Sequence, residues 1–154
     1  MTSRDKKLQW TIRDADITDY TAMHHVRIAV LENVLSDPAR VTYNDYKTYL
    51  EERGKGWVCI YENEVIGFAI ADLIAENIWA LFVLPNNEHA GIGTALQKTM
   101  LDWYFSQGKH SVWLSTTPGT RAASFYEKSG WTPAGMEGDE LKFTMTRTAW
   151  EKLK

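Results

Sequence analysis

Residues 77–84 form a short run that is apolar on both faces of an extended chain. Alternation along a strand predicts two apolar sets, namely Ile78, Ala80, Phe82 and Leu84 on one face and Trp79, Leu81 and Val83 on the other. Pro85 ends the run. A strand with two apolar faces belongs inside a sheet that is covered on both sides. The chain is therefore expected to place helices on either face of a sheet.

The segments around this run predict a mixed α/β class. Strand-like runs over 57–61 and 65–74, separated by short turns, predict an antiparallel meander that ends in the central strand. The remaining expected elements are a strand over 8–13, a helix from Asp16 or Thr18 to about Val34, helices over 43–53, 95–107 and 120–129, and strands over 110–115, from 131 and over 141–146. No repeat or low-complexity linker interrupts them. We expect one domain over residues 1–154.

Charge and composition argue against several functional classes. Seventeen basic and twenty acidic residues give a formal charge of −3, and no basic run is present, so a nucleic-acid partner is not expected. The polar start and the lack of a long apolar segment predict a cytoplasmic protein with no membrane partner. The single cysteine, Cys59, and the histidines His24, His25 and His89 lack metal-site spacing, so no metal is expected.

A glycine-bearing loop follows the central strand and leads into a helix. It contains Ala90-Gly91-Ile92-Gly93-Thr94. Glycines let the backbone approach a phosphate, and the free N–H groups of a helix N-terminus hold anions. The P-loop lysine and the third glycine of a dinucleotide motif are both missing, which disfavours nucleotide hydrolysis and NAD binding. Taken alone, the two glycines are equally well explained as the shape of a tight turn.

A second motif lies about thirty residues further on, Ala122-x-x-Phe125-Tyr126-Glu127-Lys128-x-Gly130-Trp131. Together with Val83-x-Pro85 and Gly91-x-Gly93, it resembles the Gcn5-related N-acetyltransferase (GNAT) family, and the resemblance covers residues 65–146. It implies a mostly antiparallel twisted sheet flanked by helices, with central strands splayed apart to admit the pantetheine arm of acetyl-CoA. It also implies transfer of an acetyl group from acetyl-CoA directly to a primary amine of a small molecule or protein.

The resemblance implies a cofactor site and a catalytic acid. Tyr126 matches the tyrosine that faces the cofactor sulfur and acts as general acid. The implied cofactor-binding residues are Leu81, Phe82, Val83, Glu88, His89, Ala90, Gly91, Ile92, Gly93, Thr94, Ala122 and Phe125. The sequence departs from the family pattern at Glu88, where the family has Arg or Gln, and at Gly119, where many members have asparagine. We expect the first departure to change affinity and the second to remove a hydrogen bond.

The acceptor side is less defined. Deprotonating an amine requires a base, and the family often has a carboxylate near the start of the central strand, so Glu76 is the first candidate, with a solvated turn residue as the alternative. Arg27 interrupts the apolar stripe of the first helix and should either pair with a buried carboxylate or contact a substrate. Glu32 and Asn33 follow on that helix, and Trp79 could form a pocket wall.

Two questions about function stay open in the sequence. A non-catalytic acyl-CoA-binding sensor or regulatory module is the alternative to an enzyme, and the position of Tyr126 favours catalysis. The acceptor cannot be read, because the family sets it with its N-terminal helices and loops. A homodimer is possible, although no dimer signature is present.

Overall fold

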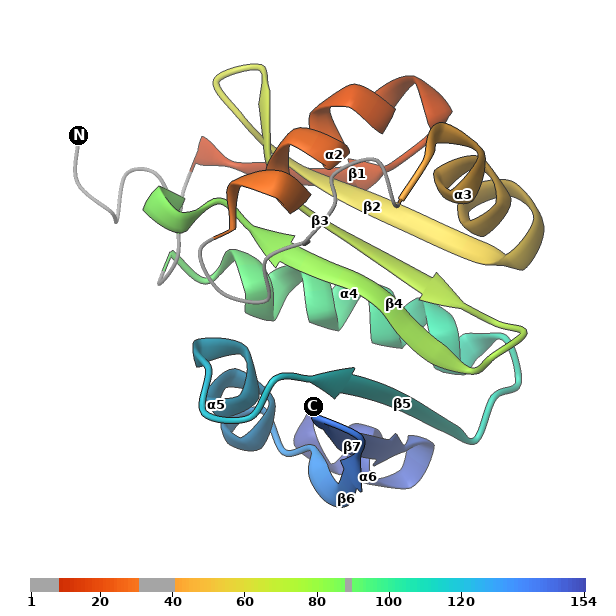
Figure 1. Cartoon of the computed structure of the whole chain (residues 1–154). Helices are drawn as coiled ribbons and strands as arrows, with labels where there is room; N and C mark the ends of the chain where they lie inside the picture. Colours follow the sequence, from red (N-terminus) through yellow and green to blue (C-terminus); the bar gives the residue numbers. More distant parts are fainter. Residues whose placement is uncertain (1–8, 31–40, 88–89) are drawn as a thin grey trace.

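The computed structural model describes residues 9–30, 41–87 and 90–154 (Figure 1). The elements in chain order are β1 (Thr11–Asp14), the 3₁₀ turn η1 (Ile17–Asp19), α2 (Tyr20–Ala29), α3 (Tyr43–Thr48), the π-helical turn η2 (Tyr49–Arg53), β2 (Gly54–Tyr61), β3 (Glu64–Asp72), β4 (Asn77–Val83), η3 (Pro85–Asn87), α4 (Ile92–Ser106), β5 (Ser111–Thr116), α5 (Arg121–Lys128), β6 (Thr132–Glu137), β7 (Glu140–Thr146) and α6 (Arg147–Leu153). The expected mixed α/β class is confirmed.

The described strands form one seven-stranded sheet in the order β1-β2-β3-β4-β5-β7-β6. Every neighbouring pair is antiparallel except β4 with β5, which is parallel. The predicted meander is β2-β3-β4, and the predicted central strand is β4. Figure 1 shows β4 and β5 separating along their length. Two apolar clusters cover the sheet, one shared with α4 and α5 and the other with α2 and α3. The sheet is thus covered on both faces.

The alternation expected along β4 is wrong at Ile78 and Trp79. Ile70 of β3 pairs with Ala80 and the next residue, Ala71, pairs with Ile78, so Trp79 is the extra residue of a β-bulge. A bulge shifts the side-chain alternation by one residue. Trp79 and Ala80 therefore both pack in the cluster on the α2 side, whereas Ile78 packs on the α4 side.

The first helix is shorter than its apolar pattern predicts. α2 ends at Ala29, because Val30 has an extended backbone with φ −66° and ψ 144°. Valine is β-branched and favours extended conformations. Residues 31–34, over which the helix was expected to continue, lie outside the described chain. A helix after the last strand, α6, was not predicted at all.

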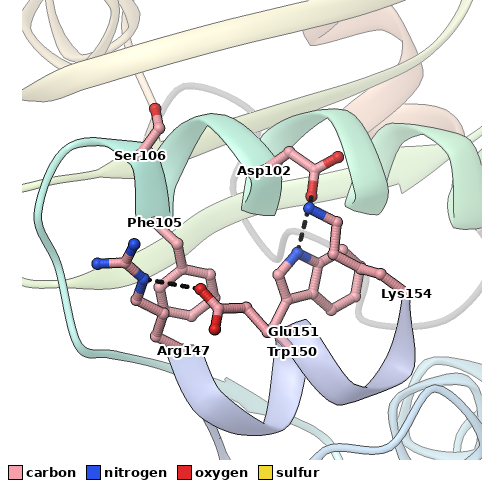
Figure 2. Close-up of a pocket in the computed structure, with 7 residues that line it drawn as sticks. All are labelled: Asp102, Phe105, Ser106, Arg147, Trp150, Glu151 and Lys154. Atoms are coloured by element: carbon pink, nitrogen blue, oxygen red, sulfur yellow. Dashed lines mark hydrogen bonds and ion pairs between the residues drawn. The ribbon is translucent and has the colours of Figure 1, made fainter.

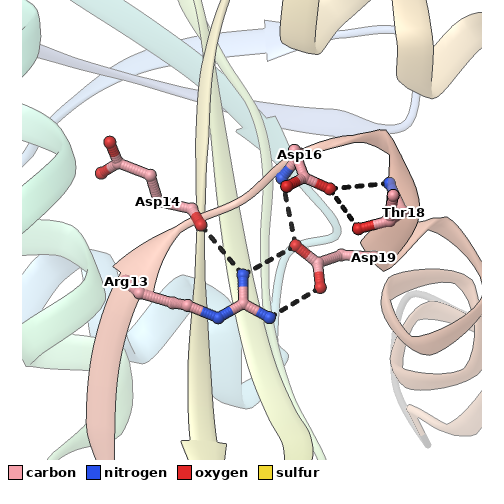
Figure 3. A network of polar contacts seen from close by, with 5 residues as sticks. All are labelled: Arg13, Asp14, Asp16, Thr18 and Asp19. Carbon is pink, nitrogen blue, oxygen red and sulfur yellow. Dashed lines mark hydrogen bonds and ion pairs between the residues drawn. The ribbon is translucent and has the colours of Figure 1, made fainter.

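Polar contacts fix the chain where it enters α2. The guanidinium of Arg13, on β1, donates to both carboxylate oxygens of Asp19 at 2.9 and 2.8 Å and to the carbonyl of Asp14 at 3.0 Å. Asp19 also accepts from the backbone N–H of Asp16, and Asp16 accepts from the backbone N–H and hydroxyl of Thr18 (Figure 3). The Arg13 contact holds the pKa of Asp19 below its ordinary value.

Candidate active site

The separation of β4 from β5 is the main feature of the candidate site. The two strands pair only at Asn77 with Trp113, whereas β5 pairs with β7 along its whole length. Trp113 closes this end, since its backbone N–H donates to the carbonyl of Glu76 at 3.1 Å and its indole N–H donates to the carbonyl of Ala75 at 2.9 Å. The strands therefore form a V that is closed at Asn77 and open toward Val83.

The open part of the V exposes unpaired main chain. Leu81, Phe82 and Val83 pair with β3 on one edge of β4, and no described strand pairs with them on the other. Buried backbone N–H and C=O groups need hydrogen-bond partners. The edge of β4 that faces β5 can therefore bind an extended ligand through its backbone. These are the three residues expected to contact the pantetheine arm.

The glycine loop lies just beyond the open end of the V. Gly91 is the N-cap of α4 with φ 80°, a left-handed conformation that favours glycine, and no side chain caps the helix. The first N–H groups of a helix have no intrahelical partner, and they face an anion favourably. Ala90 and Ile92 bury their side chains in the core, while Thr94 is exposed. Glu88 and His89 lie outside the described residues.

Gly93 brings the start of α4 close to α5. A Cβ built on Gly93 would lie 3.6 Å from the ring of Phe125, an ordinary contact distance. Ala122 and Phe125 are half-buried and pack against the larger apolar cluster. Thr120 caps α5 by accepting a hydrogen bond from the N–H of Ala123. The two sequence motifs, thirty residues apart, are thus adjacent in the fold.

Tyr126 lies in the core below this contact. Its side chain is 7% exposed, and its ring packs edge-on to Trp131 at 5.6 Å and tilted to Phe143 at 6.0 Å between centroids. Burial raises the pKa of the Tyr126 phenol above its ordinary value. No hydrogen bond joins its hydroxyl to another residue of the described chain. The hydroxyl therefore stays protonated at neutral pH, which is the form a general acid requires.

Glu76 and Asn77 lie side by side at the closed end of the V. Glu76 has φ 58°, its side chain is about half-exposed, and its carboxylate pairs with Lys109 at 3.3 Å. Asn77 is the first residue of β4, and its Oδ1 is buried without a hydrogen-bond partner in the described chain. The sequence pattern directed attention to Glu76 and gave no signal that Asn77 holds an unpaired acceptor.

Aromatic side chains line β4 on the α2 side. Trp79 stacks on Tyr49 at 4.1 Å with a 15° angle and meets Tyr46 edge-on at 5.4 Å. Arg27 reaches from the last turn of α2 over the ring of Phe82, with 4.5 Å between the guanidinium carbon and the ring centroid. Arg27 and Trp79 are thus placed on the same face of β4. Glu32 and Asn33, the other two expected substrate contacts, lie outside the described residues.

A separate pocket lies at the far end of α4. It has a volume of about 190 Å³ and is lined by Asp102, Phe105, Ser106, Arg147, Trp150, Glu151 and Lys154 (Figure 2). Arg147 pairs with Glu151 at 3.0 Å, and Asp102 accepts from Trp150 at 2.9 Å and pairs with Lys154 at 3.0 Å. These mutual contacts satisfy the charges and attach α6 to α4. The pocket is structural in character.

Residues 9–30, 41–87 and 90–154 contain neither a metal-binding cluster nor a membrane-spanning helix. No group of three or more His, Cys, Asp or Glu side chains is close enough there to hold a metal ion. None of the helices in those ranges has the length and apolar character needed to cross a membrane.

Comparison with known proteins decides the family. The model of the acetyltransferase (GNAT) family matches residues 18–131. The chain belongs to the GNAT family. The match spans β4, the glycine loop and α5, which are the elements that build the V and its surroundings. No curated protein sequence matched this chain.

Solved structures of GNAT proteins share this fold. The ribosomal-protein-S18-alanine N-acetyltransferase of Escherichia coli is 18% identical with a TM-score of 0.73, covering 90% of this chain and 94% of its own. The PaiA N-acetyltransferase of Thermoplasma acidophilum, in complex with coenzyme A, is 18% identical with a TM-score of 0.76, covering 90% and 99%. A protein of Bacillus anthracis described as a streptothricin acetyltransferase, in complex with acetyl coenzyme A, is 16% identical with a TM-score of 0.69, covering 90% and 99%. The expected splayed-sheet GNAT fold is confirmed.

Proposed function

We propose that this GNAT protein is an acetyl-CoA-dependent N-acetyltransferase that moves the acetyl group directly to a primary amine. The observation that carries the proposal is the V between β4 and β5, which opens toward the uncapped N-terminus of α4. The V offers unpaired main chain to a pantetheine arm and the helix terminus offers N–H groups to a pyrophosphate. Two similarly folded acetyltransferases are complexes with coenzyme A or acetyl coenzyme A, which supports this assignment.

The main chain of β4 would stabilise the reaction. As an amine attacks the thioester, negative charge develops on the carbonyl oxygen, and a fixed N–H donor at that position lowers the barrier. The unpaired edge at Leu81 to Val83 supplies such donors without any reorganisation of the strand. The tetrahedral intermediate then breaks its C–S bond and leaves a coenzyme A thiolate, which must take up a proton.

Tyr126 is the proposed source of that proton. Its phenol is protonated because burial raises its pKa, and its helix lies against the start of α4 through Phe125 and Gly93. The core position of Tyr126 also favours the alternative, an acyl-CoA-binding module without catalysis, because a tyrosine in such a place can serve packing alone. The two functions differ in whether any amine is acetylated.

Glu76 is the proposed base, acting directly or through water, at the closed end of the V. Its carboxylate contacts Lys109 at 3.3 Å and is about half-exposed, so water can reach it. Asn77 cannot act as a base, but its buried Oδ1 can accept a hydrogen bond from a water between it and Glu76. A proton released by the amine would therefore reach Glu76 through water, toward the point where β4 and β5 meet.

An acceptor screen tests the proposed function. Free thiol released from acetyl-CoA is measured with amino acids, polyamines, aminoglycosides and peptides with free N-termini. Release above the amine-free background with at least one acceptor, together with N-acetylated product by mass spectrometry, supports the enzyme. Tight binding of acetyl-CoA with no acetylated product across the panel supports the binding module.

A further inference from the structure

Arg27 has an environment that a structural arginine would not have. It lies on the half-buried face of α2, and its Nη1 is buried without a hydrogen-bond partner. No carboxylate of the described chain pairs with it; its recorded contact is with the ring of Phe82. Burial lowers the pKa of this guanidinium, although arginine keeps its charge at neutral pH. One nitrogen of the guanidinium is thus held away from water, with the face of the Phe82 ring beside the charged group.

Other arginines of the chain are satisfied. Arg13 pairs with Asp19, Arg53 with Asp72 and Arg147 with Glu151. A buried charge without a partner destabilises the folded protein, so an apolar residue would suit the α2 face better. The sequence left two explanations for Arg27, a buried carboxylate or a substrate contact. No carboxylate within residues 9–30, 41–87 and 90–154 pairs with Arg27, which favours the substrate contact.

The position of Arg27 places this charge on the acceptor side of the sheet. Phe82, under the guanidinium, pairs with Phe68 of β3 and lies between Leu81 and Val83, whose main-chain groups point toward the V. The uncapped end of α4, where the pyrophosphate is proposed to bind, lies on the opposite face with Ile92 in the other apolar cluster. The cofactor's phosphates therefore have their own site, and Arg27 is free for the second substrate.

We propose that Arg27 binds a carboxylate of the acceptor, so that the substrate is a small amine that also carries a carboxylate group, such as an amino acid. This inference rests on the proposed function. A single negative charge neutralises the single unpaired positive charge, and the planar guanidinium matches the planar carboxylate. Phe82 and its neighbour Phe68 provide an apolar floor beneath the ion pair, which strengthens it by excluding water.

Matched acceptors test the assignment. Each α- or ω-amino acid is compared with its carboxamide and with an amine that carries a phosphate in place of the carboxylate. Amidation lowers the pKa of the neighbouring amine and so favours reaction by itself, which biases the test against the proposal. We expect kcat/KM for the carboxylate form to exceed that for the carboxamide by roughly tenfold to a hundredfold, as for a hydrogen-bonded charge.

The variant Arg27→Gln should remove this preference and leave the KM for acetyl-CoA unchanged. Arg147→Gln is the matched control, since it removes an exposed, paired arginine on α6 and should keep the preference. Arg27→Met should show the same loss with an unchanged or higher Tm, because it removes a buried unpaired charge; a structural arginine would instead lower the Tm.

The outcomes separate the inference from the proposed function. Equal rates with carboxylate and carboxamide, a preference for the phosphate, or a preference that survives in Arg27→Gln would each overturn the carboxylate site while leaving the acetyltransferase intact. If no amine is acetylated, the proposed function fails and the acceptor site fails with it.

Discussion

Asn77 of β4 and Trp113 of β5 form the single residue pair that joins these two strands. Everything proposed for the site depends on this arrangement, because the pair closes one end of the V and lets the strands separate toward Val83. The indole and backbone N–H groups of Trp113 hold the preceding turn at Ala75 and Glu76. The closed end therefore fixes the candidate base and the unpaired Oδ1 of Asn77 relative to the main chain of β4.

Acetyl-CoA should raise the thermal midpoint of the protein. A ligand that binds only the folded state stabilises it by about 2.7 kcal/mol at a hundredfold excess over Kd. Differential scanning fluorimetry with saturating acetyl-CoA, with ATP and NAD as controls, measures the effect. An acetyl-CoA shift no larger than the shift with NAD would contradict a cofactor site in the V.

Gly91 and Gly93 should respond differently to alanine. Gly93 is helical and has room for a Cβ, so Gly93→Ala should change stability by no more than about 1 kcal/mol. Gly91 has φ 80°, so Gly91→Ala should cost roughly 1–2 kcal/mol. Alanine keeps the backbone N–H, whereas the branched side chain of Gly93→Val should block the approach of a phosphate and weaken acetyl-CoA binding by roughly tenfold or more. Calorimetry and chemical denaturation separate affinity from stability; unchanged affinity in a folded Gly93→Val variant would show that the phosphates bind elsewhere.

Tyr126→Phe should lower kcat with little change in acetyl-CoA affinity. A positioned general acid contributes about 10²–10⁴-fold in rate, and phenylalanine keeps the ring packing on Trp131 and Phe143. The raised pKa also predicts that Tyr126 does not limit the rate on the alkaline side near neutral pH. Steady-state kinetics over pH with an identified acceptor provide the check. A kcat within threefold of the parent would leave Tyr126 with a packing role.

Glu76→Gln should lower kcat/KM most strongly at low pH, where the acceptor amine is fully protonated and most needs a base. The matched control is Glu137→Gln, which removes another exposed, lysine-paired carboxylate in the β6–β7 hairpin. The measurement is the pH profile of kcat/KM for the three proteins. Coincident profiles for parent and Glu76→Gln would assign proton removal to solvent or to another group.

The ion pair between Arg13 and Asp19 should make stability depend on pH. Its carboxylate has a folded-state pKa below the unfolded value, so the stabilisation is present above about pH 4, the unfolded pKa, and is lost as pH falls through the lower folded pKa. Arg13→Gln should cost about 0.5–1 kcal/mol at pH 7 and progressively less below pH 4. Urea unfolding of the parent and of Arg13→Gln at several pH values tests this. If the difference in free energy of unfolding between the two proteins stays constant down to pH 3, the destabilisation does not come from the charge pair.

The sequence predicts elements well where the signal is local. The helices predicted over 43–53, 95–107 and 120–129 are confirmed as α3 with η2, α4 and α5, and Thr42 and Thr120 cap the first and last of them. The bulge at Trp79 could not be predicted, because it arises from pairing with β3 and not from the β4 sequence itself. Likewise, Arg27 was visible as a charge in an apolar stripe, but its lack of a partner depends on side chains distant in sequence.

Because Asn77 and Trp113 are the single residue pair between β4 and β5, the sheet consists of two groups of strands that are only weakly joined. Strands β1 to β4 are joined by continuous ladders, and so are β5, β7 and β6, but the seam between the two groups carries almost no backbone hydrogen bonding. The two half-sheets can therefore change their mutual angle without breaking a ladder. An extended molecule bound between β4 and β5 would connect the two half-sheets and restrict their relative motion. The rigidity of the whole sheet would then depend on whether the site is occupied.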